Sequence, residues 1–197
     1  MSTNDELREA IMTADEQDQI GYVRYLCELY LKDHPGHART LVMYARSLIS
    51  LGQYADAFSA VDRAESSVSE EHLQYVFSLR GHLLEAQGDF AAAEKMFLKA
   101  YDLDPADATY LIFAASTAFS RGDLVRAETL ARQATQCPEG AIDEAFFNLG
   151  GYLLSQRQYQ EAVLCYRKAL EIDSDYALAK ERLADVELIL KREESDQ

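Results

Sequence analysis

The sequence predicts an all-α fold built from stacked antiparallel helical hairpins. Helix-forming residues, above all Ala, Leu, Glu, Gln and Arg, recur throughout its 197 residues. Apolar residues recur at i, i+3, i+4 and i+7, which is the spacing of one helix face. Small residues fall in columns separated by 34 to 36 positions, and this indicates a repeated unit. The three columns are Ala57, Ala93, Ala127 and Ala162; Ala64, Ala100, Ala134 and Ala169; and Ala45, Gly81, Ala115 and Gly150.

Residues 143–176 show the repeated unit most clearly. One apolar stripe runs through Leu149 and Leu153, a second runs from Tyr159 to Leu170, and residues 155–158 interrupt the pattern between them. Two helices joined by a short turn are therefore predicted. At small residues such as Gly150 a helix can approach its neighbour closely, and a large side chain such as Tyr166 can fill the space around them. A single hairpin cannot bury both of its faces, so it needs stacked neighbours.

This unit resembles the tetratricopeptide repeat (TPR), a helical hairpin of about 34 residues. The resemblance implies a right-handed α-solenoid, the TPR superhelix, closed by a C-terminal capping helix. Position 174 holds Ser, where the family usually has Pro. The matching residues are Phe146, Leu149, Gly150, Tyr159, Ala162, Tyr166 and Ala169, with Ser174 in the proline position.

The remaining chain divides into copies of this unit, and we expect one TPR solenoid domain over residues 1–197. A degenerate first repeat, expected to depart from the pattern because one of its faces is uncovered, is followed by four closer repeats and a single amphipathic helix. The three prolines, Pro35, Pro105 and Pro138, all fall at junctions, where helices stop. The expected ranges are 4–37 for the degenerate repeat, 38–73, 74–107, 108–142 and 143–176 for the other repeats, and 177–194 for the capping helix.

The charge of the chain limits its partners. With 19 basic and 34 acidic residues, the formal net charge is −15 at pH 7. Nucleic acids and anionic membranes both require a basic surface, so neither is an expected partner. The acidic surface favours solubility, or a preference for basic partners.

The cysteines and the N-terminal segment favour a cytoplasmic location. Cys27, Cys137 and Cys165 show no motif spacing, and two of them, Cys27 and Cys165, lie on apolar helical patterns, which predicts small core residues. A disulfide framework is not expected. The N-terminal segment is charged and has no apolar signal-peptide core, and no run approaches the roughly 18 apolar residues of a membrane span.

No motif predicts catalysis. His34 and His37 form an H-x-x-H pair in a junction loop, but a metal site would need further ligands, and the pair is interpreted as two solvated loop histidines. Gly150-Gly151 lacks the context of a phosphate-binding loop. No Ser, Cys or Lys has a motif-level partner for nucleophilic chemistry. We therefore expect no enzyme, no metal and no cofactor.

The resemblance implies a binding groove, because in TPR proteins the first helix of each hairpin lines the concave side of the superhelix. Its lining is basic near Arg39 and Arg46 and apolar around Ile112, Phe119 and Phe147, a character that suits a peptide with an apolar segment. As an alternative, some of these aromatic side chains pack between hairpins. The expected groove residues are Arg39, Val42, Arg46, Tyr75, Ser78, His82, Thr109, Ile112, Ser116, Phe119, Glu144, Phe147, Asn148 and Leu154, with Glu85 and Gly151 on the same faces.

One TPR subfamily can be tested on the sequence. Members that hold the C-terminal carboxylate of heat-shock chaperones use a clamp of Lys, Asn and Arg side chains on successive groove helices. No alignment supplies that set here, so a co-chaperone of this type is not expected. The equivalent positions fall on Arg8, Met12, Met43, Tyr75 and Leu79, or on Ser78, His82, Phe113, Glu144 and Asn148.

Three functional hypotheses follow. The first is a non-enzymatic scaffold or adaptor that binds a peptide or protein segment in the concave groove. The second is a self-associating assembly subunit, a homo-oligomer formed through the cap helix or the first repeat. The third is an enzyme or a regulatory domain of one, and no motif supports it.

Overall fold

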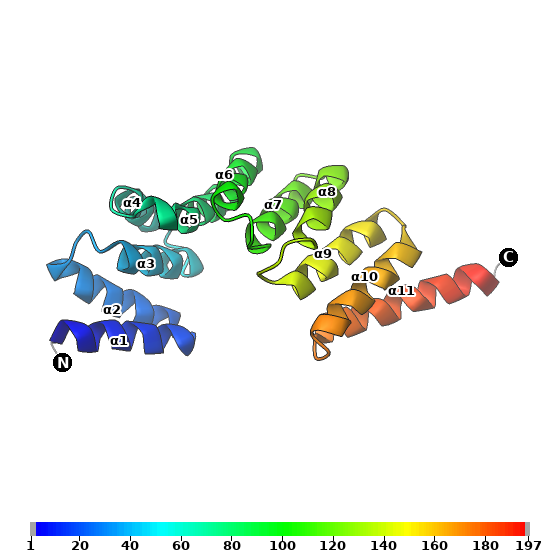
Figure 1. The fold of residues 1–197 in the computed structure, drawn as a ribbon, viewed down its shortest axis with the longest axis horizontal. Coiled ribbons are helices and arrows are strands. Elements are labelled where there is room, and N and C mark those ends of the chain that lie inside the picture. The colour runs from blue at the N-terminus through cyan, green and yellow to red at the C-terminus, as the bar shows by residue number, and fades with distance from the viewer. Residues whose placement is uncertain (1–2, 196–197) are drawn as a thin grey trace. The chain divides into compact units, whose positions relative to one another are not determined.

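The fold consists entirely of helices within the described residues. A computed structural model describes residues 3–195 (Figure 1). The elements are α1 (Thr3–Glu16), α2 (Ile20–Asp33), α3 (Ala38–Ser50), α4 (Tyr54–Glu65), the 3-10 turn η1 (Glu70–His72), α5 (Leu73–Ala86), α6 (Phe90–Leu103), α7 (Thr109–Ser120), α8 (Leu124–Ala134), α9 (Ile142–Ser155), α10 (Tyr159–Ile172) and α11 (Ala177–Ser195). The predicted all-α class is confirmed.

The helices pair as consecutive hairpins, from α1 with α2 to α9 with α10, and α11 packs against α10. The first helix of each hairpin begins within one residue of the start of a predicted repeat range, and each second helix ends four to eight residues before the end of that range, because the ranges include the junction loops. The chain forms two compact units, Met1–Leu103 and Asp104–Gln197, here called unit 1 and unit 2. A single solenoid domain across both units stays a prediction.

Unit 1 is held by two apolar clusters. One joins the first hairpin to α3 and contains Ile11, Val23, Cys27 and Met43. The other joins α3 and α4 to α5. Tyr44 packs against both clusters, so the hairpins of this unit share a continuous core.

Close helix contacts occur where the small-residue columns predicted them. In unit 2, a Cβ atom added at Gly150 would lie 2.7 Å from Cε1 of Tyr166, whose side chain is buried. In unit 1, a Cβ added at Gly81 would lie 2.5 Å from Cε1 of Phe97. Each glycine therefore accommodates the ring of its hairpin partner, which is the packing role predicted from the sequence.

The turn inside each hairpin contains one residue with left-handed backbone geometry. Three of the five hairpins use glycine, as at Gly122 with φ of 85°. The first and fifth hairpins use Asp18 and Arg157, with φ of 53° and 60°. A side chain with a Cβ atom is strained in this region, so Arg157 occupies a position that glycine would fill at lower cost.

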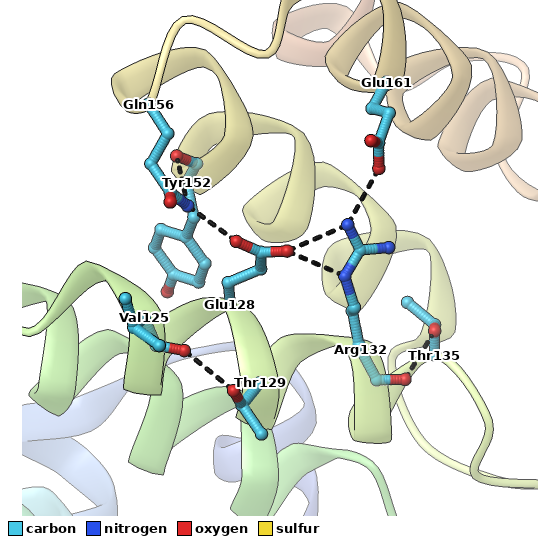
Figure 2. Close-up of polar contacts among 8 residues, drawn as sticks. All are labelled: Val125, Glu128, Thr129, Arg132, Thr135, Tyr152, Gln156 and Glu161. Atoms are coloured by element: carbon cyan, nitrogen blue, oxygen red, sulfur yellow. Dashed lines mark hydrogen bonds and ion pairs between the residues drawn. The ribbon is translucent and has the colours of Figure 1, made fainter.

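A polar network joins α8 to α9 and α10 in unit 2 (Figure 2). The carboxylate of Glu128 accepts hydrogen bonds from Nε2 of Gln156 at 2.8 Å and from Nε of Arg132 at 2.9 Å. Arg132 also donates to Glu161 at 2.8 Å. Partial burial would raise the pKa of Glu128, but the hydrogen bonds from Gln156 and Arg132 outweigh it, so that pKa lies below its ordinary value.

Two junction loops of unit 2 pair through their backbones, although the chain has no strand among its described residues. An isolated parallel bridge links Asp107 to Glu139. The amide of Ala108 donates to the carbonyl of Glu139 at 3.0 Å, and the amide of Glu139 donates to the carbonyl of Ala106 at 3.1 Å. The loop that precedes α7 is therefore fixed to the loop that precedes α9.

Candidate functional site

A hollow that brings together several predicted groove residues lies in unit 1, over the first helices of its hairpins. It is a cavity of about 450 Å³, here called the α3 cavity. Helix α3 supplies half of its lining residues because positions 39, 42, 43 and 46 share one helix face. The lining residues are Met12 and Asp15 of α1; Ala38, Arg39, Val42, Met43 and Arg46 of α3; Val68 of the following loop; His72 of η1; and Tyr75 of α5.

Four of the predicted groove residues meet in the α3 cavity: Arg39, Val42, Arg46 and Tyr75. The other lining residues were missed. Met43 follows the identified Val42 directly and could have been found from its helix face. Met12 and Asp15 lie beside the core stripe of the first helix, and their inclusion depends on how α1 lies against α3, for which the sequence carries no local signal.

The two arginines of the α3 cavity differ in their contacts. Arg46 forms an ion pair and a hydrogen bond with Asp15. Arg39 donates to Sδ of Met12 at 3.4 Å, and a thioether is only a weak acceptor. Tyr75 adds an aromatic ring that is 48% exposed, so the cavity combines apolar surface with a guanidinium group.

Two further predicted residues of unit 1 lie outside the lining of the α3 cavity. The ring of His82 packs edge-on against Phe97, with 4.9 Å between ring centroids. Its Nδ1 also lies 3.3 Å from a carboxylate oxygen of Glu85. Ser78 is half-buried on the same helix. His82 therefore takes part in packing within its hairpin.

The predicted apolar centre in unit 2 requires correction. Ile112 is only 3% exposed, so it belongs to the core and cannot present its side chain to a ligand. The expectation that it lies on the surface is wrong, because the apolar stripe of α7 is buried on the side that includes Ile112. Phe119 is 40% exposed, and its ring lies 5.0 Å from that of Tyr152.

Phe147 is half-buried by two tyrosines. Its ring centroid lies 5.7 Å from that of Tyr166 and 4.9 Å from that of Tyr176. Phe147 therefore packs within its own hairpin and against the loop before α11, whereas the contact of Phe119 with Tyr152 of the next hairpin is of the kind that the alternative, packing between hairpins, describes. Among Ile112, Phe119 and Phe147, the exposed aromatic surface is that of Phe119.

The other predicted residues of unit 2 lie on α7 and α9. Ser116 and Glu144 are exposed, whereas Asn148, Gly151 and Leu154 are half-buried. The half-buried Thr109 donates its amide to Oδ1 of Asp107 at 2.9 Å and so begins α7. Burial, and then the charge of Glu144, raise the pKa of Tyr152 to about 12, so its hydroxyl stays neutral at physiological pH.

The two junction histidines are not freely solvated, which corrects that interpretation. The ring of Tyr30 stacks on His34, with centroids 4.4 Å apart, and meets His37 edge-on at 5.2 Å. Nδ1 of His37 accepts a hydrogen bond from the amide of Thr40 at 3.3 Å, so His37 caps α3. No group of three or more potential metal-ligating side chains occurs among residues 3–195.

The interpretation of two cysteines as core residues is confirmed. Cys27 is fully buried and Cys165 is 9% exposed. Burial raises the pKa of Cys27 to about 12 and that of Cys165 to about 11. Since the thiolate is the reactive form, neither thiol is an activated nucleophile at neutral pH. None of the helices in the described part of the chain is long and apolar enough to span a membrane.

Comparison with known proteins gives the family. Residues 143–176 match one tetratricopeptide repeat model and residues 78–141 match a second. The first match has the bounds predicted for the fifth hairpin, and the second covers most of the third and fourth. The sequence has no significant match among curated proteins.

Solved structures share the fold at low sequence identity. A TPR protein from Parabacteroides merdae is 19% identical with a TM-score of 0.74, covering 91% of this chain and 69% of its own. A thermophilic TPR protein from Thermus thermophilus is 18% identical with a TM-score of 0.72, covering 94% of this chain and 100% of its own. The first TPR domain of Spaghetti, bound to the HSP90 peptide SRMEEVD, is 21% identical with a TM-score of 0.56, covering 63% of this chain and 97% of its own. From the repeat register, the hairpin packing and these matches, the chain is a tetratricopeptide repeat protein.

Proposed function

We propose that the protein is a non-enzymatic adaptor that holds a peptide or protein segment against the first helices of its hairpins. The observation that carries the proposal is the α3 cavity, in which Arg39, Val42, Arg46 and Tyr75 meet around about 450 Å³. Concave sites with apolar walls and a few polar groups are typical of ligand binding. The TPR family generally mediates protein–protein interaction, and the Spaghetti domain is bound to a peptide.

The absence of an activated catalytic group among the described residues supports a binding role over chemistry. The buried thiols have raised pKa values, and the histidines of the first junction are engaged in packing and capping. The proposed partner is a protein or peptide with an apolar segment, and nucleic acid is not proposed because the chain is strongly acidic.

The test compares two tyrosines of similar exposure on different faces of unit 1. Tyr75 lines the α3 cavity and is 48% exposed, whereas Tyr25 lies on α2 outside the cavity lining and is 54% exposed. Peptides selected from a display library on the wild-type protein would be measured against Tyr75→Glu and Tyr25→Glu. We expect Tyr75→Glu to lose binding, because a carboxylate replaces the aromatic anchor. Binding lost with Tyr25→Glu and kept with Tyr75→Glu would refute the proposal, provided circular dichroism shows both variants folded.

A self-associating assembly subunit is the second candidate, and the surface of the last helices favours it. Leu178 and Leu188 of α11 are 51% and 52% exposed, and Leu164 of α10 is 60% exposed. A cavity of about 540 Å³ also lies between these helices. Light scattering on the wild-type protein and on Leu188→Glu distinguishes the candidates. An oligomer that dissociates in the variant supports self-association through α11, and a wild-type monomer argues against it.

We also propose a cytoplasmic location. The three cysteines are free, and two of them are buried as thiols. A reducing compartment keeps such thiols unpaired. Fractionation of cells that express the tagged protein would test this, and recovery in a secreted or periplasmic fraction would contradict it.

A further inference from the structure

A second, smaller cavity joins the α3 cavity in unit 1. Its volume is about 250 Å³, and it shares Met12, Arg39 and Met43 with the larger one. Its remaining lining residues are Asp5, Arg8, Glu9, Ile11, His37 and Thr40. Arg39 therefore stands where the two cavities meet, and Arg8 faces the smaller one.

Arg39 and Arg8 lack the ion pairs that three other arginines of unit 1 form. Arg24 is paired with Glu28, Arg46 with Asp15, and Arg80 with two carboxylates, whereas Arg63 donates to the carbonyl of Pro35. Within residues 3–195, no ion pair involves Arg8 or Arg39. Arg8 shares the smaller cavity with Asp5 and Glu9, whereas the side-chain contact of Arg39 is with the weak thioether acceptor of Met12.

His37 lies in the lining of the smaller cavity, and the neighbouring charges change the pKa of its imidazole. Burial lowers the pKa of this imidazole, and the positive charges of Arg8, His34 and Arg39 lower it further. The smaller cavity therefore holds charges of both signs, because the carboxylates of Asp5 and Glu9 lie in the same lining as Arg8 and Arg39.

The wall beside these charges is apolar. Met12, Val42 and Met43 lie next to Arg39, and Tyr75 lies across the larger cavity. Methionine side chains adapt to varied apolar shapes. Met12 and Met43 offer no hydrogen-bond donor, so this wall suits an apolar side chain better than a peptide C-terminus.

We propose that the paired cavities bind an internal acidic segment of a partner protein, with an Asp or Glu carboxylate on Arg39 and a neighbouring apolar side chain against Met12 and Met43. The carboxylate would complete the charge-assisted hydrogen bonds that the Arg39 guanidinium lacks within the protein. Arg8 would add long-range attraction at the smaller cavity. This inference rests on the proposed binding function of the α3 cavity and specifies the chemistry of its partner.

The experiment uses fluorescein-labelled peptides that are acetylated at the N-terminus and amidated at the C-terminus. One alternates Glu with Leu, the second replaces Glu by Gln, and the third replaces Leu by Ser. Fluorescence anisotropy on the full chain should show the Glu/Leu peptide binding about tenfold or more tightly than either of the others. Added salt should weaken its binding, because the exposed charges are screened.

Two matched Arg→Gln variants assign the effect to a residue. Arg39→Gln should weaken binding of the Glu/Leu peptide by about tenfold or more, whereas Arg24→Gln on α2, outside both cavities, should leave it unchanged. Arg39 is exposed, so its substitution leaves the core intact. Equal effects of the two substitutions, or equal binding of the Glu/Leu and Gln/Leu peptides, would overturn the inference.

The remaining outcomes are also decisive. Binding that requires a free C-terminal carboxylate in place of the amide would show recognition of a chain end and would refute the internal segment. No binding of any peptide would refute it as well. Neither result decides the adaptor proposal. That proposal is tested separately by comparing Tyr75→Glu with Tyr25→Glu, because the library-selected peptides used there can carry any charge.

Discussion

The adjacent glycines of α9 offer a test of the packing argument, because one added methyl group should act in opposite directions at the two positions. In a helix interior, Gly→Ala stabilises by about 1 kcal/mol through backbone propensity. At Gly151, the nearest atom to an added Cβ would be Oη of Tyr166 at 3.9 Å, an ordinary contact. Gly151→Ala should therefore raise the free energy of unfolding by about 1 kcal/mol.

At Gly150 the same methyl group meets the ring of Tyr166. The added Cβ would lie 2.7 Å from Cε1 and 3.0 Å from Cδ1, against about 3.5–4.0 Å for an unstrained carbon contact. Tyr166 is 1% exposed, and Phe147 packs beside it, so the ring cannot turn into solvent. Overpacking of this kind costs about 1–3 kcal/mol. Subtracting the propensity gain leaves a net loss of up to about 2 kcal/mol.

Urea denaturation followed by circular dichroism would measure both variants. Since propensity cancels between them, the difference between Gly150→Ala and Gly151→Ala reports the overpacking cost, about 1–3 kcal/mol. Replacing the ring in Tyr166→Leu should reduce the overpacking cost of Gly150→Ala, because the two positions are in direct contact. If Gly150→Ala stabilises as much as Gly151→Ala, the small-residue slot is not a packing constraint and the reasoning fails.

Three further predictions concern stability. Arg157→Gly should raise the free energy of unfolding, measured by urea denaturation, by about 1 kcal/mol, because it removes the strain of a left-handed backbone at φ of 60°. Gly122→Ala should lower that free energy, and a decrease with Arg157→Gly would contradict the argument. Folding lowers the pKa of Glu128, so the ionised carboxylate stabilises the fold above the unfolded-state pKa, and this stabilisation is lost as pH falls through the folded-state pKa. Glu128→Gln should therefore lower the free energy of unfolding by up to about 1 kcal/mol at pH 7 and by less in acid, and a difference between variant and wild type that does not change with pH would count against the network. Deleting residues 177–197 should expose the face of the last hairpin that Ala179 and Val186 cover, so the truncated protein should aggregate in light scattering or unfold at a lower temperature. A truncated monomer as stable as the wild type would disprove the capping role of α11.

The fold was predictable because its determinants are local and repeated. Small residues such as Gly81 and Gly150 recur in register with the rings that pack on them, and several helix breaks fall at turns with glycine or proline. This information lies within each 34-residue window. The starts of the hairpins could therefore be placed to within a residue.

The candidate site was less predictable because it depends on packing between hairpins. Ile112 and Phe119 lie two turns apart on α7, and their sequence context does not reveal that one is 3% and the other 40% exposed. In the same way, Met12 enters the cavity walls only because α1 lies beside α3. Face assignments within a repeat follow from periodicity, whereas exposure at its edges depends on the neighbouring hairpin.

The backbone bridge between Asp107 and Glu139 restricts where the chain can accept extra residues. An inserted segment is tolerated where the flanking backbone is exposed and its polar groups are free to bond to water. At this junction the amides of Ala108 and Glu139 are committed, and Gly140 has φ of 90° with Asp107 against the position of its missing Cβ. Lengthening either loop would break both hydrogen bonds at once. A tag, a loop graft or an inserted domain would therefore be accommodated with less loss at the exposed residues 66–67 that follow α4, whose amides donate only to carbonyls of that helix, than at residues 106–108 or 139–140, where the hydrogen bonds join two loops.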